Sequence, residues 1–366
     1  LSTGTSENSG GQTGITPEDA LAYAITASFE RVSVVSEKQL YETALRRGVG
    51  GVSPEEIAAA AARAGILAAT VDGRKLVTTR EVLAEEEAML AFARNGRGTR
   101  RSLGGLAAEY YHSDTLNPGQ VAAVKHVLTS SDRVMLIRGR AGTGKTTLMK
   151  EAVAQIETPS GKQVFTFAPS ADASRGVLRQ EGFTDADTVA RLLVDEVLQE
   201  RVRGNVLWID EAGLLGVRDM AKVFALADRL DCRVILSGDS KQHGSVSRGD
   251  ALRLLEERAG IRPAETSDIM RQRGTYRDAV AAIAKGDLAD GLERLDKFGC
   301  FVEVLKDDPY LMLCNDYLKT LNAGKTALII SPTHREGEAV TREVREALKR
   351  TGKIGTQDHP FWALRN

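Results

Sequence analysis

The chain has 366 residues, of which 42% are hydrophobic and 27% are charged, and its formal net charge is −1. This length suits two or three domains that each bury a core, and the charge balance neither demands nor forbids a nucleic-acid partner. The sequence shows no bilayer-spanning apolar run and no signal-peptide pattern, and its three cysteines form no C-x-x-C pair, which indicates a reducing, cytoplasmic compartment.

The first 95 residues comprise a polar tail and a small module. Residues 1–16 are rich in Gly, Ser and Thr, which predicts a disordered tail. Capping signals then predict helices that begin near residues 17, 37, 54 and 80. Apolar runs at 66–70 and 76–79 flank an Asp-Gly pair and predict a β-hairpin. We expect a winged-helix-like α+β module over residues 17–95, which either contacts DNA or serves for packing and docking.

The end of this module and the stretch after it carry many charges. Glu81, Glu85, Glu86 and Glu87 are expected to be solvated on the last helix. Residues 94–101 (RNGRGTRR) are basic and contain two glycines. An interdomain linker is the simpler interpretation of this stretch, and a segment that contacts phosphates is the alternative.

Short apolar runs alternate with helical patterns in the rest of the chain. The runs lie at 134–137, 163–167, 206–209, 233–236 and 327–330. Such runs, bounded by turn residues and separated by helices, are typical of βαβ units. The sequence therefore predicts an α/β fold in which a parallel sheet carries helices on both faces.

The most specific motif follows the first of these runs. Residues 139–146 (GRAGTGKT) match G-x-x-x-x-G-K-[ST], the phosphate-binding loop. Its glycines let backbone N–H groups approach phosphate oxygens, and the helix that follows directs its positive end at the same anion. Lys145 can reach the β and γ phosphates, and Thr146 can bind Mg²⁺. The residues expected to contact a nucleoside triphosphate are Gly139, Gly142, Thr143, Gly144, Lys145, Thr146 and Thr147.

A later strand is predicted to end in two carboxylates. Residues 206–209 (VLWI) run directly into Asp210 and Glu211. Beside a phosphate loop, Asp210 can hold Mg²⁺ through water and Glu211 can orient or deprotonate the attacking water. An apolar strand that ends in Asp-Glu is often only a strand boundary, so the upstream phosphate loop is what favours the functional interpretation.

Three further side chains are candidates on weaker grounds. Gln242 follows the run at 233–236 and can sense the γ-phosphate. Arg271, in an RQR turn, offers a guanidinium for the transition-state charge, although such a turn on its own is more often solvated. Gln120, upstream of the phosphate loop, has the donor and acceptor needed to read an adenine edge.

Taken in order, these motifs resemble those of superfamily 1 DNA helicases of the 5′-to-3′ branch, and most of all the helicase portion of MobF-type conjugative relaxases. The motifs are LNPGQ (116–120), GRAGTGKTT (139–147), FAPSADASRG (167–176), DTV (187–189), WIDEAGLL (208–215), LSGDSKQ (236–242) and MRQR (270–273). The resemblance implies an ATP- and Mg²⁺-dependent motor that translocates on single-stranded DNA. It also implies a RecA-like P-loop domain at 96–262 and a second RecA-like domain that starts in 263–366.

The resemblance also implies a role for each candidate residue. Gln120 would bind adenine, Gln242 would couple the γ-phosphate to DNA, and Arg271 would contact phosphate from the second motor domain. The phosphate-loop residues and the two carboxylates would keep the roles given above. A strand-end loop at 168–170 would contact single-stranded DNA.

Parts of the family pattern are absent from the sequence. No T-x-H-x-x-Q-G loop or second arginine motif follows Thr333, and no relaxase half with a tyrosine nucleophile precedes the module. We therefore expect a middle fragment whose second RecA-like domain is truncated and whose parent chain carries the relaxase domain. Nucleotide binding is expected of this chain, and unwinding of its parent.

Two other classes of function stay open. One is a nucleotide-dependent switch or assembly ATPase, which includes a degenerate helicase that works as a DNA-binding module. The other is a small-molecule kinase, which is disfavoured because the GD-x-x-Q and RQR turns have no role in one. Dependence of ATP turnover on single-stranded DNA separates a motor from a switch.

Overall fold

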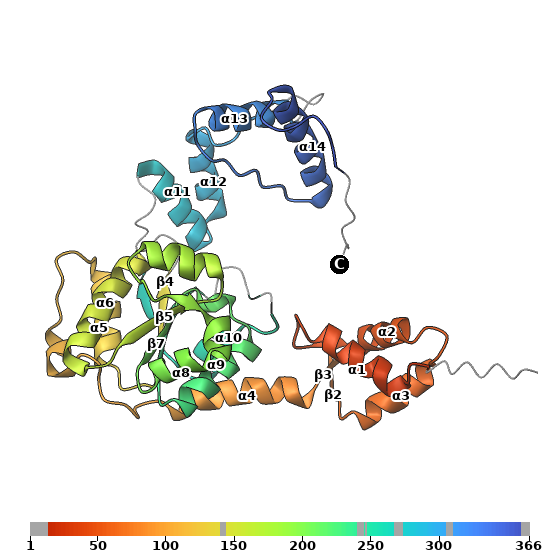
Figure 1. Cartoon of the computed structure of the whole chain (residues 1–366), viewed down its shortest axis with the longest axis horizontal. Coiled ribbons are helices and arrows are strands. Elements are labelled where there is room, and N and C mark those ends of the chain that lie inside the picture. Colours follow the sequence, from red (N-terminus) through yellow and green to blue (C-terminus); the bar gives the residue numbers. More distant parts are fainter. Residues whose placement is uncertain are drawn as a thin grey trace, which may run out of the picture. The chain divides into compact units, whose positions relative to one another are not determined.

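The computed structural model describes residues 14–139, 144–239, 245, 247–266, 274–304 and 310–359. The chain divides into two compact units, Leu1–Arg273 and Gly274–Asn366. In the described residues, every strand belongs to the first unit, whereas helices occur in both (Figure 1). The predicted boundaries between the tail, the small module and the two RecA-like domains, after residues 16, 95 and 262, stay predictions.

The first unit begins with three helices and a small antiparallel sheet (Figure 1). The elements are α1 (Pro17–Ser28), β1 (Val35–Ser36), α2 (Glu37–Arg47), α3 (Pro54–Arg63), β2 (Leu67–Val71) and β3 (Arg74–Thr78). Asp72 and Gly73, with φ of 49° and 73°, make the tight turn between β2 and β3. The predicted helices and hairpin are confirmed, and β1, which pairs with β3, is an addition.

Side-chain caps explain why these helices begin where they do. The hydroxyls of Thr16, Ser36 and Ser53 each accept a hydrogen bond from the backbone N–H three residues later. At Ser53 the bond is reciprocal, because the Glu56 carboxylate accepts from the Ser53 N–H and completes a capping box. Each such cap stabilises its helix by about 1 kcal/mol. The helix starts are therefore encoded locally.

The rest of the first unit is built on a six-stranded sheet with the order β6-β5-β7-β8-β4-β9, in which all pairings are parallel. The strands are β4 (Val134–Gly139), β5 (Val164–Ala168), β6 (Asp187–Thr188), β7 (Val206–Ile209), β8 (Arg233–Gly238) and β9 (Ala264–Thr266). The predicted α/β parallel sheet is confirmed. The short edge strands β6 and β9 had no signal of their own in the sequence.

Helices cover both faces of this sheet. They are α4 (Arg80–Asn95), α5 (Pro118–Thr129), α6 (Lys145–Ser160), α7 (Val189–Val194), α8 (Glu196–Val202), α9 (Val217–Arg229) and α10 (Ala251–Arg258), with shorter turns η1 (Gly105–Tyr110), η2 (Asp172–Leu178) and η3 (Ala212–Leu214). Successive strand residues alternate between two hydrophobic clusters. Leu136 packs in the cluster that includes α9 and α10, whereas Met135 packs in the cluster that includes α5 and α6. The alternation follows from the pleat of the strands.

Helix α4 belongs to two cores. Val82, near its start, packs in the core of the small module, whereas Met89, near its end, packs in the core of the parallel sheet. Phe92 of α4 stacks on Phe224 of α9 with ring centroids 4.7 Å apart. The module and the sheet are therefore joined by a continuous helix that is buried at both ends.

Arg248, which lies between β8 and α10 in the sequence, makes a second contact with the module. Its Nη1 donates to the Phe29 carbonyl oxygen at 2.8 Å, and its backbone N–H donates to the Glu30 carbonyl oxygen at 3.2 Å. Its Nη2 pairs with the Glu85 carboxylate. The expectation that Glu85 is solvated is wrong, because this guanidinium reaches it and leaves its side chain only 30% exposed.

The basic stretch 94–101 is packed against the sheet and its helices. Arg94 donates to the Arg258 carbonyl oxygen at 2.8 and 3.1 Å. The Gly98 N–H donates to Asp132 at 2.7 Å, and Arg100 pairs with Asp231 at 2.6 Å. The stretch therefore connects α4 to the sheet as an ordered segment.

The second unit contains α11 (Gly274–Lys285), α12 (Leu288–Lys297), α13 (Leu311–Asn322) and α14 (His334–Arg350). The prediction of a strand at 327–330 is wrong, since these residues belong to no strand or helix. Leu328 and Ile330 are each 84% exposed. A strand needs a neighbour to pair its backbone, and the described residues of this unit contain none. A second RecA-like domain here stays a prediction.

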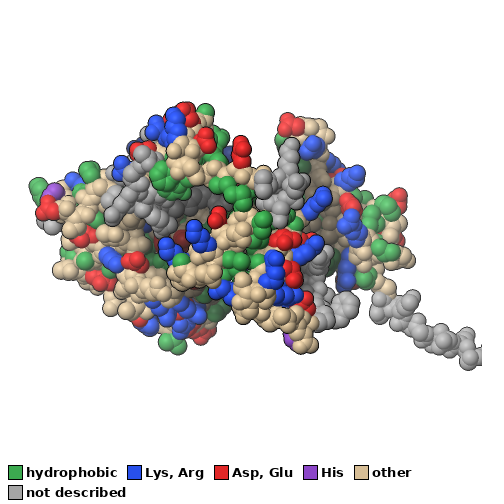
Figure 2. Space-filling model, turned by 90° about the horizontal axis from the view of Figure 1, so that it is seen from above, with side chains coloured by type: hydrophobic (Ala, Val, Ile, Leu, Met, Phe, Trp, Pro, Cys, Tyr) green, Lys and Arg blue, Asp and Glu red, His purple; other side chains and the backbone are tan. Residues whose placement is uncertain are grey.

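The surface carries both signs of charge. On the face shown in Figure 2, Lys and Arg side chains are interspersed with Asp and Glu side chains. Within the described ranges, no helix combines the length and the apolar character needed to cross a membrane.

Candidate functional site

The phosphate loop connects β4 to α6. Residues 134–137 of β4 are buried, and β4 lies between β8 and the edge strand β9, which pairs with β4 from Ile137 onwards. Gly144, the N-cap of α6, has φ 73° and ψ 33°, a left-handed conformation that glycine adopts without a steric penalty. Among the described residues, no side chain caps this helix start. The first N–H groups of α6 can therefore bind an anion.

The structure describes five of the seven residues predicted to contact the nucleotide. These are Gly139, which ends β4, and Gly144, Lys145, Thr146 and Thr147, which open α6. Lys145 and Thr146 are half-buried, and Thr147 is exposed. Gly142 and Thr143 lie outside the described residues.

Gln120 lies beside the loop, but its side chain already makes hydrogen bonds. Its Oε1 accepts from the Asn117 N–H at 3.0 Å, and its Nε2 donates to the Gly144 carbonyl oxygen at 3.2 Å. The Gln120 N–H returns a bond to Asn117 Oδ1 at 2.9 Å, which completes a capping box at the start of α5. Gln120 therefore ties α5 to the phosphate loop. The reading of adenine by Gln120 stays a prediction.

Strand β7 delivers Asp210 and Glu211 to the carboxyl edge of the sheet. The Asp210 N–H donates to the Phe167 carbonyl oxygen of β5 at 2.8 Å, so Asp210 continues the ladder. Glu211 has φ 53° and ψ 34°, a left-handed conformation that is uncommon for a residue other than glycine. This turn leads the chain into η3, and strained backbone of this kind concentrates at functional sites.

A chain of buried hydrogen bonds orients Asp210. Trp208 Nε1 donates to Ser237 Oγ at 2.9 Å, and Ser237 Oγ donates to Asp210 Oδ1 at 2.7 Å. An indole N–H is only a donor, so the hydrogen of the Ser237 hydroxyl is directed to Asp210. Trp208 is 0% exposed and Ser237 is 1% exposed, so water does not compete. The chain fixes the rotation of the Asp210 carboxylate.

Sequence reasoning missed this chain of hydrogen bonds. Trp208 and Ser237 are the polar members of the otherwise apolar runs VLWI and VILS, which is a visible signal. The pairing of β7 with β8 brings them together, and no sequence motif states that pairing.

The environment of Glu211 changes its acidity. Burial raises the pKa of Glu211 above its ordinary value, and the nearby Asp210 carboxylate raises it further, while Lys145 opposes the rise. Asp172, at the start of η2, also contributes to the rise. Lys145 and Glu211 therefore lie near enough to interact, although they come from different strand–helix connections. A carboxylate with a raised pKa is a stronger base than an ordinary one.

Two predicted residues, Gln242 and Arg271, lie outside the described residues, and their roles stay predictions. The connection that leads towards Gln242 begins at Asp239, which is 8% exposed. A Cβ atom placed on Gly213 would lie 3.0 Å from the Asp239 carbonyl oxygen. The ends of β7 and β8 are therefore packed tightly against each other at this edge.

The described residues fit a nucleoside triphosphate with Mg²⁺. The open start of α6 and the Lys145 ammonium supply positive charge for phosphate oxygens. The carboxylates of Asp210 and Glu211 are of the kind that would hold Mg²⁺ or accept a proton from water. Because β4 and β7 both pair in parallel with β8, the start of α6 and the carboxylate pair lie at the same edge of the sheet.

Known proteins resemble this chain over a large part of its length. "Probable conjugal transfer protein TraA" of Sinorhizobium fredii NGR234 is 28% identical over 285 residues, which cover 76% of this chain and 25% of that protein. "Multifunctional conjugation protein TraI" of Escherichia coli K12 is 31% identical over 192 residues, or 50% and 11% of the two chains. This chain thus spans about a quarter or less of the length of these relatives.

Solved structures also show a likeness. The Pif1 helicase from Candida albicans matches with a TM-score of 0.40 and 18% identity, over 62% of this chain and 60% of that one. The family model described as "AAA domain" matches residues 115–305, which is more than half of the chain and includes the phosphate loop and the carboxylate pair. By this match the chain belongs to the AAA domain family.

Proposed function

We propose that this chain is the ATP-binding and ATP-hydrolysing motor region of a DNA helicase that translocates on single-stranded DNA. The observation that carries the proposal is that the start of α6 and the Asp210–Glu211 pair lie at the same edge of the parallel sheet. The order of the helicase-like motifs and the conjugation proteins among the relatives support it.

Each residue of the site has a defined task in this proposal. Lys145 and the first N–H groups of α6 bind and orient the β and γ phosphates. Thr146 and Asp210 would hold Mg²⁺, which neutralises phosphate charge when it is bound. Glu211 accepts the proton of the attacking water, and its raised pKa suits this step. Gln242 and Arg271, which lie outside the described residues, would complete the site.

The proposal extends to the setting in which the motor works. TraA and TraI are named as conjugal transfer and conjugation proteins, and both are much longer than this chain. We therefore assign the chain to a conjugation protein that also carries a relaxase domain and acts in the cytoplasm. The small module at 17–95 packs on the motor through α4 and Arg248, which supports a packing role for the module.

The affinity of the chain for single-stranded DNA in different nucleotide states tests the proposal. A motor must change its affinity for single-stranded DNA as its nucleotide changes, whereas an assembly ATPase has no such requirement. We expect a labelled oligonucleotide to bind with measurably different affinity in the presence of a non-hydrolysable ATP analogue and of ADP. Equal affinity in both states, or no binding, would contradict a motor.

A further inference from the structure

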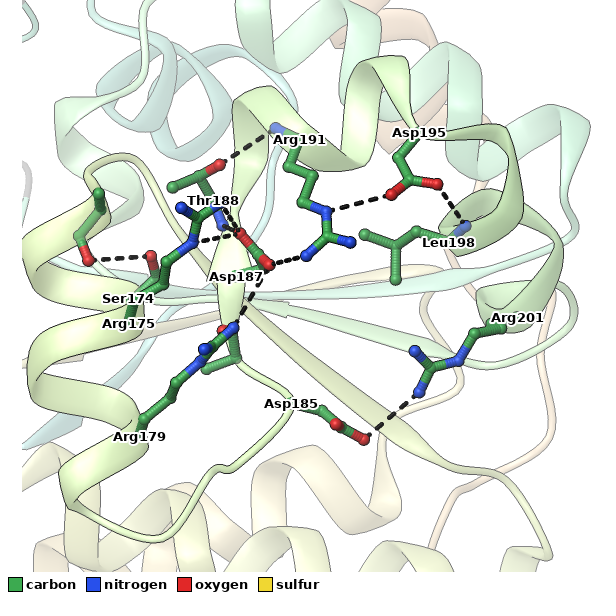
Figure 3. Close-up of polar contacts among 12 residues, drawn as sticks. Ser174, Arg175, Arg179, Asp185, Asp187, Thr188, Arg191, Asp195, Leu198 and Arg201 are labelled. Atoms are coloured by element: carbon green, nitrogen blue, oxygen red, sulfur yellow. Dashed lines mark hydrogen bonds and ion pairs between the residues drawn. The ribbon is translucent and has the colours of Figure 1, made fainter.

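Three arginines converge on one buried carboxylate at the β6 edge of the sheet (Figure 3). The side chain of Asp187 is 4% exposed. Its Oδ1 accepts from Nε and Nη2 of Arg175, at 3.0 and 2.8 Å, and from the Thr188 N–H at 2.8 Å. Its Oδ2 accepts from Nη1 of Arg191 at 2.6 Å and from Nη2 of Arg179 at 3.4 Å. We call Arg175, Arg179 and Arg191 the guanidinium cluster.

The guanidinium cluster carries more charge than its carboxylates neutralise. Its three positive charges face two negative charges, those of Asp187 and Asp195, which leaves one positive charge. The arginine side chains are 47%, 40% and 49% exposed. Each guanidinium has five N–H groups, so donors remain for a ligand in solvent. The neighbouring Arg201 differs, because it faces Asp185 in a one-to-one pair (Figure 3).

Asp187 holds the cluster in place. Burial alone would raise the pKa of Asp187, but the Thr188 N–H and the arginines outweigh burial and lower it. Asp187 is therefore an anion at neutral pH, and it restrains three side chains that would otherwise be flexible. A site organised before binding loses less conformational entropy when the ligand arrives.

The position of the cluster connects it to the proposed DNA track. Strand β6 pairs with β5 so that Thr188 lies opposite Ala168, at the start of the loop 168–170. Arg175 lies on η2, a π-helical turn, and such turns occur often at functional sites. The cluster and the loop therefore share the carboxyl edge of a parallel sheet, where ligands bind in open α/β folds.

We propose that the guanidinium cluster binds the phosphodiester backbone of single-stranded nucleic acid and that Asp187 preorganises it. The planar fork of each guanidinium matches two phosphate oxygens. This inference rests on the proposed function, since it names the surface by which the motor would hold its track. The competing view is that the cluster only stabilises the edge of the sheet.

Single substitutions separate these two views. We would measure the affinity of the chain for a labelled oligonucleotide between 50 and 200 mM salt for R175Q, R179Q and R191Q, with R201Q as the matched control. One phosphate contact on a single strand contributes a slope of about 0.7 in log K against log salt, or about fivefold in affinity at 0.1 M salt. We expect each cluster variant to lose about that much affinity and slope, and R201Q to lose neither.

Asp187→Asn gives a sharper test, because simple electrostatics predicts the opposite result. Removal of a negative charge should strengthen DNA binding if only net charge matters. We expect weaker binding, since the arginines lose the carboxylate that orients their side chains. Stronger binding would overturn the role of Asp187.

The outcomes also distinguish this inference from the proposed function. If the unaltered chain binds the oligonucleotide and all three cluster variants bind it with unchanged affinity and slope, the cluster is structural and the inference is overturned while the motor proposal stands. If the unaltered chain does not bind, both fail. Each single variant leaves two arginines on Asp187, so folding, checked by thermal unfolding, is expected to persist.

Discussion

Similar apolar runs have different structures in the two units of the chain. In the first unit, the runs at 134–137 and 206–209 are buried and belong to strands that have a neighbouring strand on each side. In the second unit, the run at 327–330 joins no strand, and Leu328 and Ile330 are 84% exposed. The side chains are of the same kind, so the difference lies in the presence of a neighbouring strand. Local sequence sets the tendency to extend, and tertiary pairing decides whether a strand forms.

Glu211→Gln has the largest expected effect and tests the chemistry of the first unit. The amide keeps the shape of the side chain but cannot accept a proton, so we expect ATP turnover to fall by about 10²- to 10⁴-fold while nucleotide binding persists. Phosphate release and the binding of a fluorescent ATP analogue measure the two quantities. Retained turnover would remove Glu211 from the proposed step.

The pH profile of the unaltered chain provides a second readout for Glu211. The deprotonated carboxylate is the active form, so turnover falls as the pH drops through its pKa. Because burial and Asp210 raise this pKa, the loss should begin at a higher pH than for an ordinary glutamate. A profile that stays flat down to the ordinary range would contradict the environment described for Glu211.

Lys145→Ala tests the phosphate end of the same site. Loss of a charge-assisted contact of about 3 kcal/mol lowers nucleotide affinity by about a hundredfold. Lys150→Ala is the matched control, because Lys150 lies on the same helix and pairs with Glu181 at the surface at 3.0 Å. Titration with a fluorescent ATP analogue measures both. Equal affinities for the two variants would exclude Lys145 from the site.

Arg248→Met tests whether the small module and the sheet act as one folding unit. The change leaves the partly buried Glu85 carboxylate without its partner, so we expect a loss of about 3 kcal/mol in the free energy of unfolding. Arg253→Met removes an exposed arginine from α10, and we expect a change of less than about 0.5 kcal/mol. Denaturant unfolding compares them. Similar midpoints would show that the joint contributes little.

Ser237→Ala tests the chain of hydrogen bonds that orients Asp210. We expect about a tenfold loss of turnover, together with a higher Mg²⁺ concentration for half-maximal activity, because Asp210 becomes free to rotate. Ser174→Ala is the control, since Ser174 is equally buried and its hydroxyl donates to a backbone carbonyl. An unchanged Mg²⁺ requirement would reduce Ser237 to a packing role.

Leu328→Asn has the smallest expected effect and returns to the comparison of the units. A side chain that is already 84% exposed contributes little to folding, so the free energy of unfolding should change by less than about 0.5 kcal/mol. Leu136→Asn, in a buried strand, should destabilise the chain severely. A large effect of Leu328→Asn would show that residues 327–330 pack against a partner in solution.

Much of the first unit was predictable because its signals are local. The caps at Thr16, Ser36 and Ser53 set the helix starts, and the Asp72–Gly73 turn set the hairpin. The strands β4, β5, β7 and β8 are apolar runs longer than three residues. Each of these features depends only on a few residues that are neighbours in the sequence.

Features that depend on distant residues were not predictable. The chain Trp208–Ser237–Asp210 needs the pairing of β7 with β8, and the Arg248–Glu85 pair joins residues 163 positions apart. The role of Gln120 in binding adenine was predicted from its chemistry and from the family resemblance, but its hydrogen bond to the Gly144 carbonyl oxygen was not predictable from either. The long-range contacts of a parallel sheet carry little trace in local sequence.

The rate of ATP turnover by this chain, with and without single-stranded DNA, tests the central claim most directly. A motor couples hydrolysis to its track, so we predict that the oligonucleotide stimulates phosphate release and that Glu211→Gln abolishes the stimulated rate. Turnover at the same rate with and without DNA would contradict the motor and favour a nucleotide-dependent switch.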